Sequence, residues 1–212
     1  MLATQARTNE MRRGYLGGRS PPDHPSAYLA AMYPKMRALA GTVADGVAMG
    51  SLHSPAYVRE VVRPAVTQAL QRSDRDPAKF QFVASALASV GPDADVARER
   101  ARRGLCRLFT PLPHPYYEYV LREQGWSEMV DRISAAMQAE NMAQAVDCID
   151  DEAVDSLLVA GDVGGCRAAI GRYGGALDEI VLTDATSVGA SIDPTTSGAA
   201  AGLEELLTLA PG

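Results

Sequence analysis

Few side chains in this sequence suit metal binding or nucleophilic catalysis. Histidine occurs only three times, as His24, His53 and His114, and no two potential ligands stand at the spacing of a metal site. Nucleophilic triads usually depend on a histidine base, and no such arrangement is recognisable here. The sequence therefore favours neither a metal centre nor a hydrolytic triad.

Cysteine and long apolar runs are also scarce. Cys106, Cys148 and Cys166 are widely spaced and odd in number, so we interpret them as reduced thiols of a cytoplasmic protein. No apolar run approaches the roughly 20 residues that a membrane helix needs, and the N-terminus has no apolar signal core. A formal net charge of −6 argues against nucleic-acid binding. We expect neither a membrane nor a nucleic acid as a partner.

The chain is rich in apolar residues, at 47% of 212, which is enough for the core of one domain. We expect three regions along it. Residues 1–25 form an irregular segment dense in glycine and proline. Residues 26–185 form the folded domain, and residues 186–212 form a flexible tail with a short terminal helix.

The stretch from Ser26 to Gly50 predicts a strand, a helix and a second strand. Residues 26–32 are an almost wholly apolar run, typical of a strand buried on both faces. Pro34 then opens a helix, where its missing N–H costs nothing, and Gly41 marks the helix end. Residues 46–50 form the second strand. Because the crossover between them is a short helix, the two strands should be parallel neighbours.

Two further strands are expected, at 80–90 and 180–183, and helices fill the chain between the strands. Ser54 caps one helix, which Pro64 should kink. A helix beginning at Asp150 is expected to run to Gly161, where a second helix starts. The predicted class is α/β, with four strand–helix units and a high helix content.

Several polar or aromatic groups allow two interpretations each. His53 follows the second strand, where a parallel barrel would place a substrate contact, although an exposed loop histidine is the ordinary case. The tyrosines near residue 117 could line a pocket for a flat ring or pack under a loop. The arginines of residues 98–107 could bind phosphate or form a solvated face. The acids at 150–152 are better explained by helix capping than by acid–base catalysis.

Two motifs resemble one family. The stretch SAYLAAMYPKMRALAGTVADGVAMG is similar to the fifth strand, fifth helix and sixth strand of the luciferase-like flavin or deazaflavin oxidoreductases, including the methylenetetrahydromethanopterin-reductase type. The stretch AVDSLLVAGDVGGCRAAIGRYGGALDEIVL is similar to the closing pattern of the same family. The resemblance runs from about Pro25 to Thr183. It implies the C-terminal half, or four βα units, of a luciferase-like (β/α)8 TIM barrel.

The resemblance also implies a cofactor, coenzyme F420 or FMN. The backbone at Ala30, Ala31, Met32 and Tyr33 would contact its phosphate-bearing tail, and amides at the start of the following helix favour an anion. Members of the family usually have glycine just before the proline, where the backbone approaches the cofactor. Here Met32 and Tyr33 stand in that turn, which departs from the family pattern.

The implied activity is hydride transfer to, or monooxygenation of, a small organic substrate. Four parallel strands leave two unpaired edges and an uncovered inner face. The chain would therefore form a homo-oligomer, bind a partner chain that supplies the missing half-barrel, curl over its own insertion, or stay marginally folded. The alternative is a truncated, non-catalytic half-barrel that acts as an assembly subunit or is a remnant.

Overall fold

The computed structural model describes residues 26–189 and 205–209. The segment 1–25 and most of the expected tail lie outside the described residues, so those two expectations stay predictions. No helix in the described part is long and apolar enough to cross a membrane.

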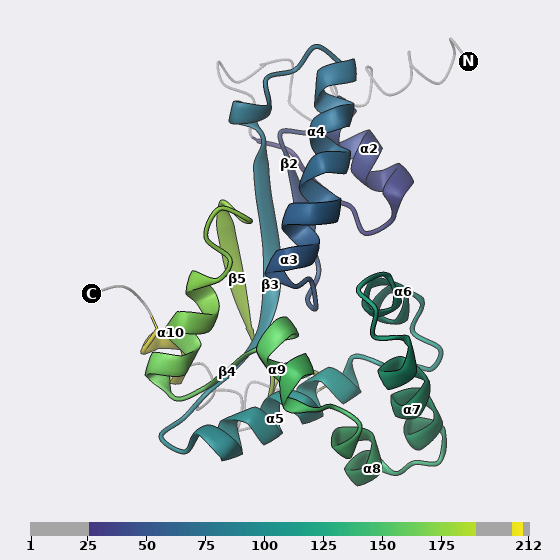
Figure 1. Cartoon of the computed structure of the whole chain (residues 1–212), viewed down its shortest axis with the longest axis vertical. Helices are drawn as coiled ribbons and strands as arrows, with labels where there is room; N and C mark the ends of the chain where they lie inside the picture. Colours follow the sequence, from purple (N-terminus) through teal and green to yellow (C-terminus); the bar gives the residue numbers. More distant parts are fainter. Residues whose placement is uncertain (1–25, 190–204, 210–212) are drawn as a thin grey trace, which may run out of the picture.

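A parallel sheet organises the described chain (Figure 1). Its five strands are β1 (Tyr28–Ala30), β2 (Gly46–Met49), β3 (Gln81–Val90), β4 (Val159–Gly161) and β5 (Glu179–Asp184). The strands run in the order β1-β2-β3-β4, and β5 pairs with β3 as well. The four strands expected from the sequence are therefore confirmed, and so is the parallel pairing of β1 with β2. The expectation that the first strand is buried on both faces is wrong: β1 has three residues, of which Tyr28 and Ala30 are exposed and Leu29 is partly buried, because β1 is an edge strand of the described sheet.

Helices connect these strands. They are α2 (Pro34–Val43), α3 (Pro55–Tyr57), α4 (Arg63–Arg72), α5 (Ala94–Arg107), α6 (Pro115–Glu123), α7 (Ser127–Gln138), α8 (Met142–Asp147), α9 (Asp151–Leu157) and α10 (Val163–Gly171), with a π-helical turn η1 (Val58–Val62) and a 3-10 turn η2 (Pro77–Lys79). Local sequence explains their starts. Pro34 and Pro55 occupy first turns, and Ser54 accepts a hydrogen bond from the Tyr57 amide. Asp150 accepts one from the Ala153 amide, which confirms its capping role.

Pro64 interrupts the long helix in the expected region. Residues 55–72 run through α3, η1 and α4, and the Arg63 amide donates to the Val58 carbonyl, five residues back. Proline cannot donate a backbone hydrogen bond, and its ring crowds the carbonyl four residues before it. A widened π turn just ahead of the proline accommodates this conflict.

Two expected helices are wrong at their ends. Helix α2 continues two residues past Gly41, to Val43. The second is the helix expected from Asp150 to Gly161, because α9 ends at Leu157 and Leu158 is already extended. The next three residues form β4, which is wholly buried and pairs with residues 88–90 of β3. A short apolar run fits a strand or a helix equally well by periodicity, and only the neighbouring strand decided between them.

The two faces of the sheet differ in what covers them. Leu29, Val47 and Phe82 are in register on one face, and α4 and α10 pack on this face, with the Arg63 guanidinium 4.1 Å from the Phe82 ring centre. The opposite face, which would be the barrel interior, is partly bare. Tyr28 is 44% exposed there and Val181 is 45% exposed.

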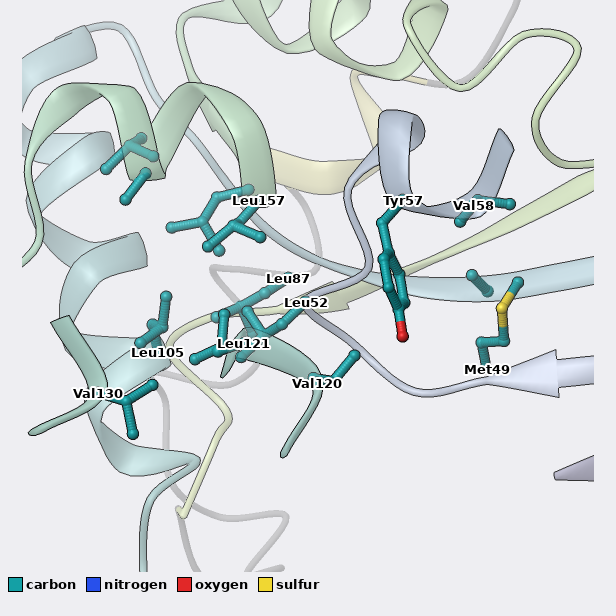
Figure 2. Packing of buried hydrophobic residues seen from close by; sticks show 14 of the residues in the cluster. Met49, Leu52, Tyr57, Val58, Leu87, Leu105, Val120, Leu121, Val130 and Leu157 are labelled. Carbon is teal, nitrogen blue, oxygen red and sulfur yellow. The ribbon is translucent and has the colours of Figure 1, made fainter. Parts of the chain in front are cut away.

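The carboxyl-terminal part of that inner face is covered by the chain itself. Leu87 lies on it and is fully buried, in one cluster with Leu52, Leu105, Leu121 and others (Figure 2). The insertion between β3 and β4 supplies much of this cover. The chain thus curls over its own insertion, as one expectation had it, only at the carboxyl-terminal part of the inner face.

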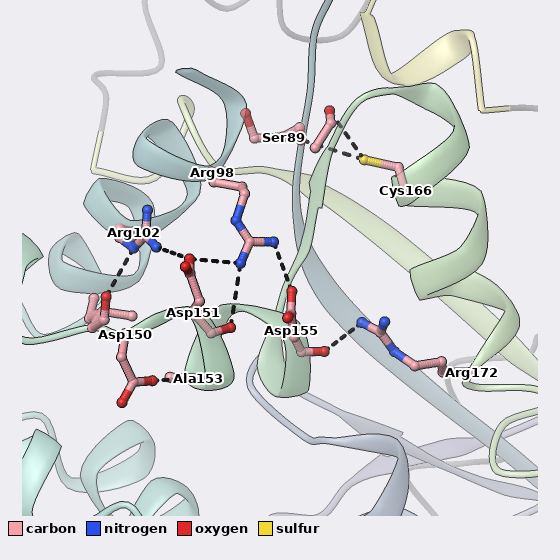
Figure 3. Close-up of polar contacts among 11 residues, drawn as sticks. Ser89, Arg98, Arg102, Asp150, Asp151, Ala153, Asp155, Cys166 and Arg172 are labelled. Atoms are coloured by element: carbon pink, nitrogen blue, oxygen red, sulfur yellow. Dashed lines mark hydrogen bonds and ion pairs between the residues drawn. The ribbon is translucent and has the colours of Figure 1, made fainter. Parts of the chain in front are cut away.

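Arginines fasten the insertion in place. The Arg98 guanidinium contacts the Asp151 carboxylate at 2.9 Å and the Asp155 carboxylate at 2.7 Å, so α5 is tied to α9 (Figure 3). Arg102 contacts Asp151 at 2.6 Å and donates to the Ile149 carbonyl at 2.9 Å. These arginines of α5 therefore serve internal pairing, which disfavours the phosphate-site interpretation. Exposed pairs contribute little individually, but several converge here.

We expect Gly41→Ala to lower the free energy of unfolding by about 1–3 kcal/mol. A Cβ at Gly41 would lie 2.7 Å from the Ala69 Cβ and 2.9 Å from the Val66 carbonyl oxygen, where α2 meets α4. Urea denaturation measures this change. The control is Gly171→Ala, whose Cβ meets nothing within 4 Å and which should gain about 0.5–1 kcal/mol from helix propensity. Equal effects of the two substitutions would contradict the close packing of α2 on α4.

Candidate functional site at the carboxyl ends of β1 and β2

Loops that follow parallel strands meet at one end of the sheet, where barrel enzymes build their sites. Here those loops include residues 31–33 after β1 and 50–54 after β2. The residues singled out from the sequence, Ala30 to Tyr33 and His53, therefore lie at the same end of the sheet. The structure also brings Arg37, Tyr57 and Gln124 to this end.

The segment Ala30–Tyr33 leads directly from β1 into α2. The Ala31 amide donates to the Ala48 carbonyl at 3.3 Å, so it is engaged in the sheet. Tyr33 has φ −88° and ψ 155°, an extended conformation open to any residue. The departure from glycine therefore adds bulk at this turn without straining the backbone.

The Tyr33 ring packs against helix α6. Its centre lies 4.7 Å from that of Tyr119 and 6.0 Å from that of Tyr116, and its hydroxyl donates to the Pro115 carbonyl at 3.3 Å. Tyr117 packs on His114, with ring centres 4.7 Å apart. Of the two interpretations of the tyrosines, the structure favours packing. The aromatic contacts hold α6 against the beginning of α2.

His53 is 1% exposed, so the ordinary interpretation of an exposed loop histidine is wrong. Its Nδ1 lies 2.9 Å from the Gly50 carbonyl oxygen, and because a carbonyl only accepts, Nδ1 carries the proton. Its Nε2 is buried and has no partner among the described residues. The Tyr173 hydroxyl donates to the His53 carbonyl at 3.1 Å and fixes the loop.

Burial lowers the pKa of His53 from 6.5 to about 4. The hydrogen bond to the Gly50 carbonyl acts in the opposite direction, and the nearby Arg37 charge lowers the pKa further. His53 is therefore a neutral, buried imidazole at neutral pH, with a free lone pair on Nε2. Such a group can accept a hydrogen bond.

Arg37 is a candidate site residue that the sequence alone did not single out. Its side chain is buried, at 1% exposed. Its Nη2 donates to the Tyr57 hydroxyl at 2.8 Å, and its guanidinium carbon lies 5.2 Å from the centre of that ring. The Tyr57 ring is in turn 5.9 Å from the His53 ring. The helical spacing from Arg37 to the buried Ala40 and Gly41 was the available signal.

Gln124 was also missed, and it joins the end of α6 to the loop at residues 50–54. Its Oε1 accepts from the Ser54 amide at 2.8 Å, and its Nε2 donates to the Leu52 carbonyl at 2.7 Å. The same Nε2 donates to Val120 at 2.9 Å, within the end of α6. The glutamine thereby anchors α6 to the loop that carries His53.

A groove of about 890 Å³ opens beside this loop, on the side of α3 and α9. It is lined by Ser54, Arg59, Trp126, Asp155 and Arg172 among others. Its lining does not include the Ala30–Tyr33 segment. Within the described residues, no group of three or more histidine, cysteine, aspartate or glutamate side chains could hold a metal ion.

The depressed pKa of His53 predicts a loss of stability in mild acid. The unfolded chain binds a proton at this side chain below pH 6.5, whereas the folded chain binds it only near pH 4. Stability from this group is full above pH 6.5 and falls as the pH drops towards 4, by about 3 kcal/mol in total. Urea denaturation from pH 7 to 4 measures it.

The variant His53→Asn is the matched comparison, because its amide can still donate to the Gly50 carbonyl. Its stability should fall less steeply than that of the original chain between pH 6.5 and 4. Parallel curves for the two proteins would contradict the depressed pKa.

A comparison with protein families matches residues 6–179 to the family described as luciferase-like monooxygenase. An uncharacterized protein of Mycobacterium tuberculosis is 29% identical over 163 residues, which is 74% of this chain and 46% of the relative. A 5,10-methylenetetrahydromethanopterin reductase of Archaeoglobus fulgidus is 29% identical over 141 residues, 63% of this chain and 40% of the relative. The chain thus spans about half the length of these relatives.

Solved structures agree in fold. The coenzyme F420 dependent tetrahydromethanopterin reductase of Methanopyrus kandleri matches with a TM-score of 0.62 at 21% identity, over 76% of this chain and 45% of that one. An F420-dependent secondary alcohol dehydrogenase matches with a TM-score of 0.54 at 20% identity, over 78% of this chain and 45% of that one. With the family match covering most of its length, the chain belongs to the luciferase-like monooxygenase family and carries part of its α/β barrel.

Proposed function

We propose that this chain is half of the barrel of an oxidoreductase that uses coenzyme F420 or FMN on a small organic substrate. Family membership supports the reaction class, and two related proteins are named as F420-dependent enzymes. The observation that carries the proposal is the parallel sheet with a half-bare inner face, ending at residues 30–33. Hydride transfer or monooxygenation is the chemistry that such a cofactor supplies when bound.

The side chains on the open face suit a flat cofactor ring. Ala30, Ala48 and Val83 are in register across β1, β2 and β3, and none is larger than valine. Small apolar side chains in a row form a floor on which a ring can lie. The backbone of Ala30, Ala31, Met32 and Tyr33 would then hold the phosphate-bearing tail, apart from the Ala31 amide, which the sheet already uses.

His53 is proposed as a substrate contact. Its Nε2 can accept a hydrogen bond from a substrate hydroxyl or amide. Because the atom is buried, contact requires the substrate to enter beneath the loop at residues 50–54. The role of this protein's own residues is to bind, orient and exclude water.

A second half-barrel is proposed to cover the rest of the inner face. Tyr28 and Val181 are nearly half exposed there, and β1 and β5 each have an edge without a strand partner in the described sheet. Unpaired parallel edges and bare apolar faces favour association. A second copy of the chain or a separate partner chain could supply the missing strands.

The other candidate function is a non-catalytic half-barrel that serves assembly. Two observations favour it. The Tyr33 side chain fills the turn where the family has glycine, and the buried Leu87 shows that the insertion covers part of the inner face. A chain that fills its own site would not need a cofactor.

Titration of the purified chain with FMN and with coenzyme F420, followed by fluorescence, separates these functions. The oxidoreductase proposal expects saturable binding of at least one cofactor, with light scattering on the same sample reporting an assembly larger than one chain. Absence of binding to a folded sample would favour the assembly role.

Tyr33→Gly sharpens this titration. Removal of the ring uncovers the backbone at the turn, so cofactor binding should tighten if the tail lies there. Tyr116→Ala is the control, because it removes a neighbouring ring that is 50% exposed without altering the turn. Equal affinities for the three proteins would contradict a tail site at residues 30–33.

A further inference from the structure

Arg37 is a buried positive charge for which the described chain provides no counter-charge. Its side chain is 1% exposed, and no carboxylate within residues 26–189 or 205–209 forms an ion pair with it, although nine ion pairs involve other arginines there. An arginine stays protonated in proteins. A buried charge without a partner is strongly unfavourable, so this arrangement calls for an explanation.

The hydrogen bonds of Arg37 are also incomplete. Its Nη2 donates to the Tyr57 hydroxyl at 2.8 Å, but its Nε is buried with no acceptor among the described residues. The hydroxyl contributes a dipole and no negative charge. A donor aimed at no acceptor in a buried site costs free energy, and an oxyanion would satisfy both the charge and the donor.

A second unpartnered atom lies in the same cluster. The Nε2 of His53 is buried without a partner, and Tyr57 stands between the two side chains, 5.2 Å from the Arg37 guanidinium carbon and 5.9 Å from the His53 ring centre. The three residues come from α2, from α3 and from the loop after β2. Unpartnered polar atoms from separate elements that meet in one place are typical of a binding site.

Half-buried tyrosines lie next to this cluster. Burial and the nearby Glu123 carboxylate raise the pKa of Tyr119, and the Arg37 charge acts on it in the opposite direction, so Tyr119 and Arg37 are near neighbours. The Tyr119 ring packs on Tyr33, 4.7 Å away. Side chains that are half exposed can move aside more easily than the core beneath α2, so this side offers the way in.

We propose that Arg37, with Tyr57 and His53 beside it, forms a binding site for an oxyanion, a phosphate or a carboxylate group. The anion neutralises the guanidinium and accepts the free Nε–H. It is either a free ion or the anionic group of a bound cofactor or substrate. The site stands on its own residues and does not depend on the proposed cofactor chemistry.

The first experiment compares thermal unfolding in phosphate and in chloride buffer of the same ionic strength. Phosphate at about ten times its Kd should raise the Tm of the original chain by about 2–5 °C beyond any general salt effect. Arg37→Met should lose this specific rise. In chloride it should unfold at a higher Tm than the original chain, because an unpaired buried charge has been removed.

Arg75→Met is the matched control. Arg75 lies 3.6 Å from the Asp45 carboxylate and donates to the Gly41 carbonyl. This variant should keep the phosphate response and gain no stability in chloride. Arg37→Lys keeps the charge, so it should retain part of the response even if the methionine variant folds poorly.

Two results would overturn the site. One is an equal phosphate response in all four proteins. The other is a strong loss of stability in Arg37→Met in chloride, which would mean that a carboxylate elsewhere in the chain already pairs with Arg37.

A second experiment distinguishes the two sources of the anion. If the site takes the phosphate of a cofactor, Arg37→Met should weaken FMN binding by about 10- to 100-fold and leave riboflavin binding unchanged. Unchanged FMN binding together with a lost phosphate response would assign a free oxyanion. If neither chain binds FMN, the cofactor proposal fails while the phosphate comparison still decides the Arg37 site.

Discussion

Strand β3 makes the hydrogen-bonded ladders on which the rest of the described chain depends. Its ten residues pair with β2 at 81–84, with β5 at 83–88 and with β4 at 88–90, all in parallel. Because the first and last strands reach the sheet only through β2 and β3, these ladders set the positions of all the loops at the carboxyl end. The site at β1 and β2 and the cover from the insertion both follow from this one strand.

The five strands of the described sheet do not close into a barrel. A barrel closes when its last strand pairs with its first, and closure removes both edges and fills the interior with side chains. Here α4 and α10 pack on the outer face, while the inner face is covered at its carboxyl end by the insertion and is half bare elsewhere. The matched members of the family are about twice as long as this chain. A half-bare inner face fits a chain that matches only about half of such a barrel.

Two buried polar side chains near the carboxyl ends of β1 and β2 lack hydrogen bonds that a protein interior usually provides. Buried polar atoms normally have partners, yet the Nε of Arg37 and the Nε2 of His53 have none among the described residues. Gln124 shows the contrast, since it makes three hydrogen bonds, two of them to Leu52 and Ser54 on either side of His53. Local violations of this kind are expected where a protein trades stability for binding.

Much of the fold follows from the sequence alone. The apolar runs at 26–32, 46–50 and 80–90 contain strands, and Pro34 and Ser54 begin helices, because the spacing of apolar side chains and helix capping are local properties of the chain. The stretches at residues 26–50 and 153–182 also carry the resemblance to the family that the comparison matches. These features depend on side-chain type and spacing, which the sequence states directly.

Tertiary structure decided the rest. The run at 159–161 became a strand because residues 88–90 offered it an edge. His53 became buried because Tyr173, 120 positions along the chain, closes over its loop, and Arg37 became an interior charge because Tyr57 accepts its hydrogen bond across 20 positions. The burial and the hydrogen-bond partners of residues so far apart depend on which elements meet in space. The periodicity of side chains along the sequence does not determine these meetings.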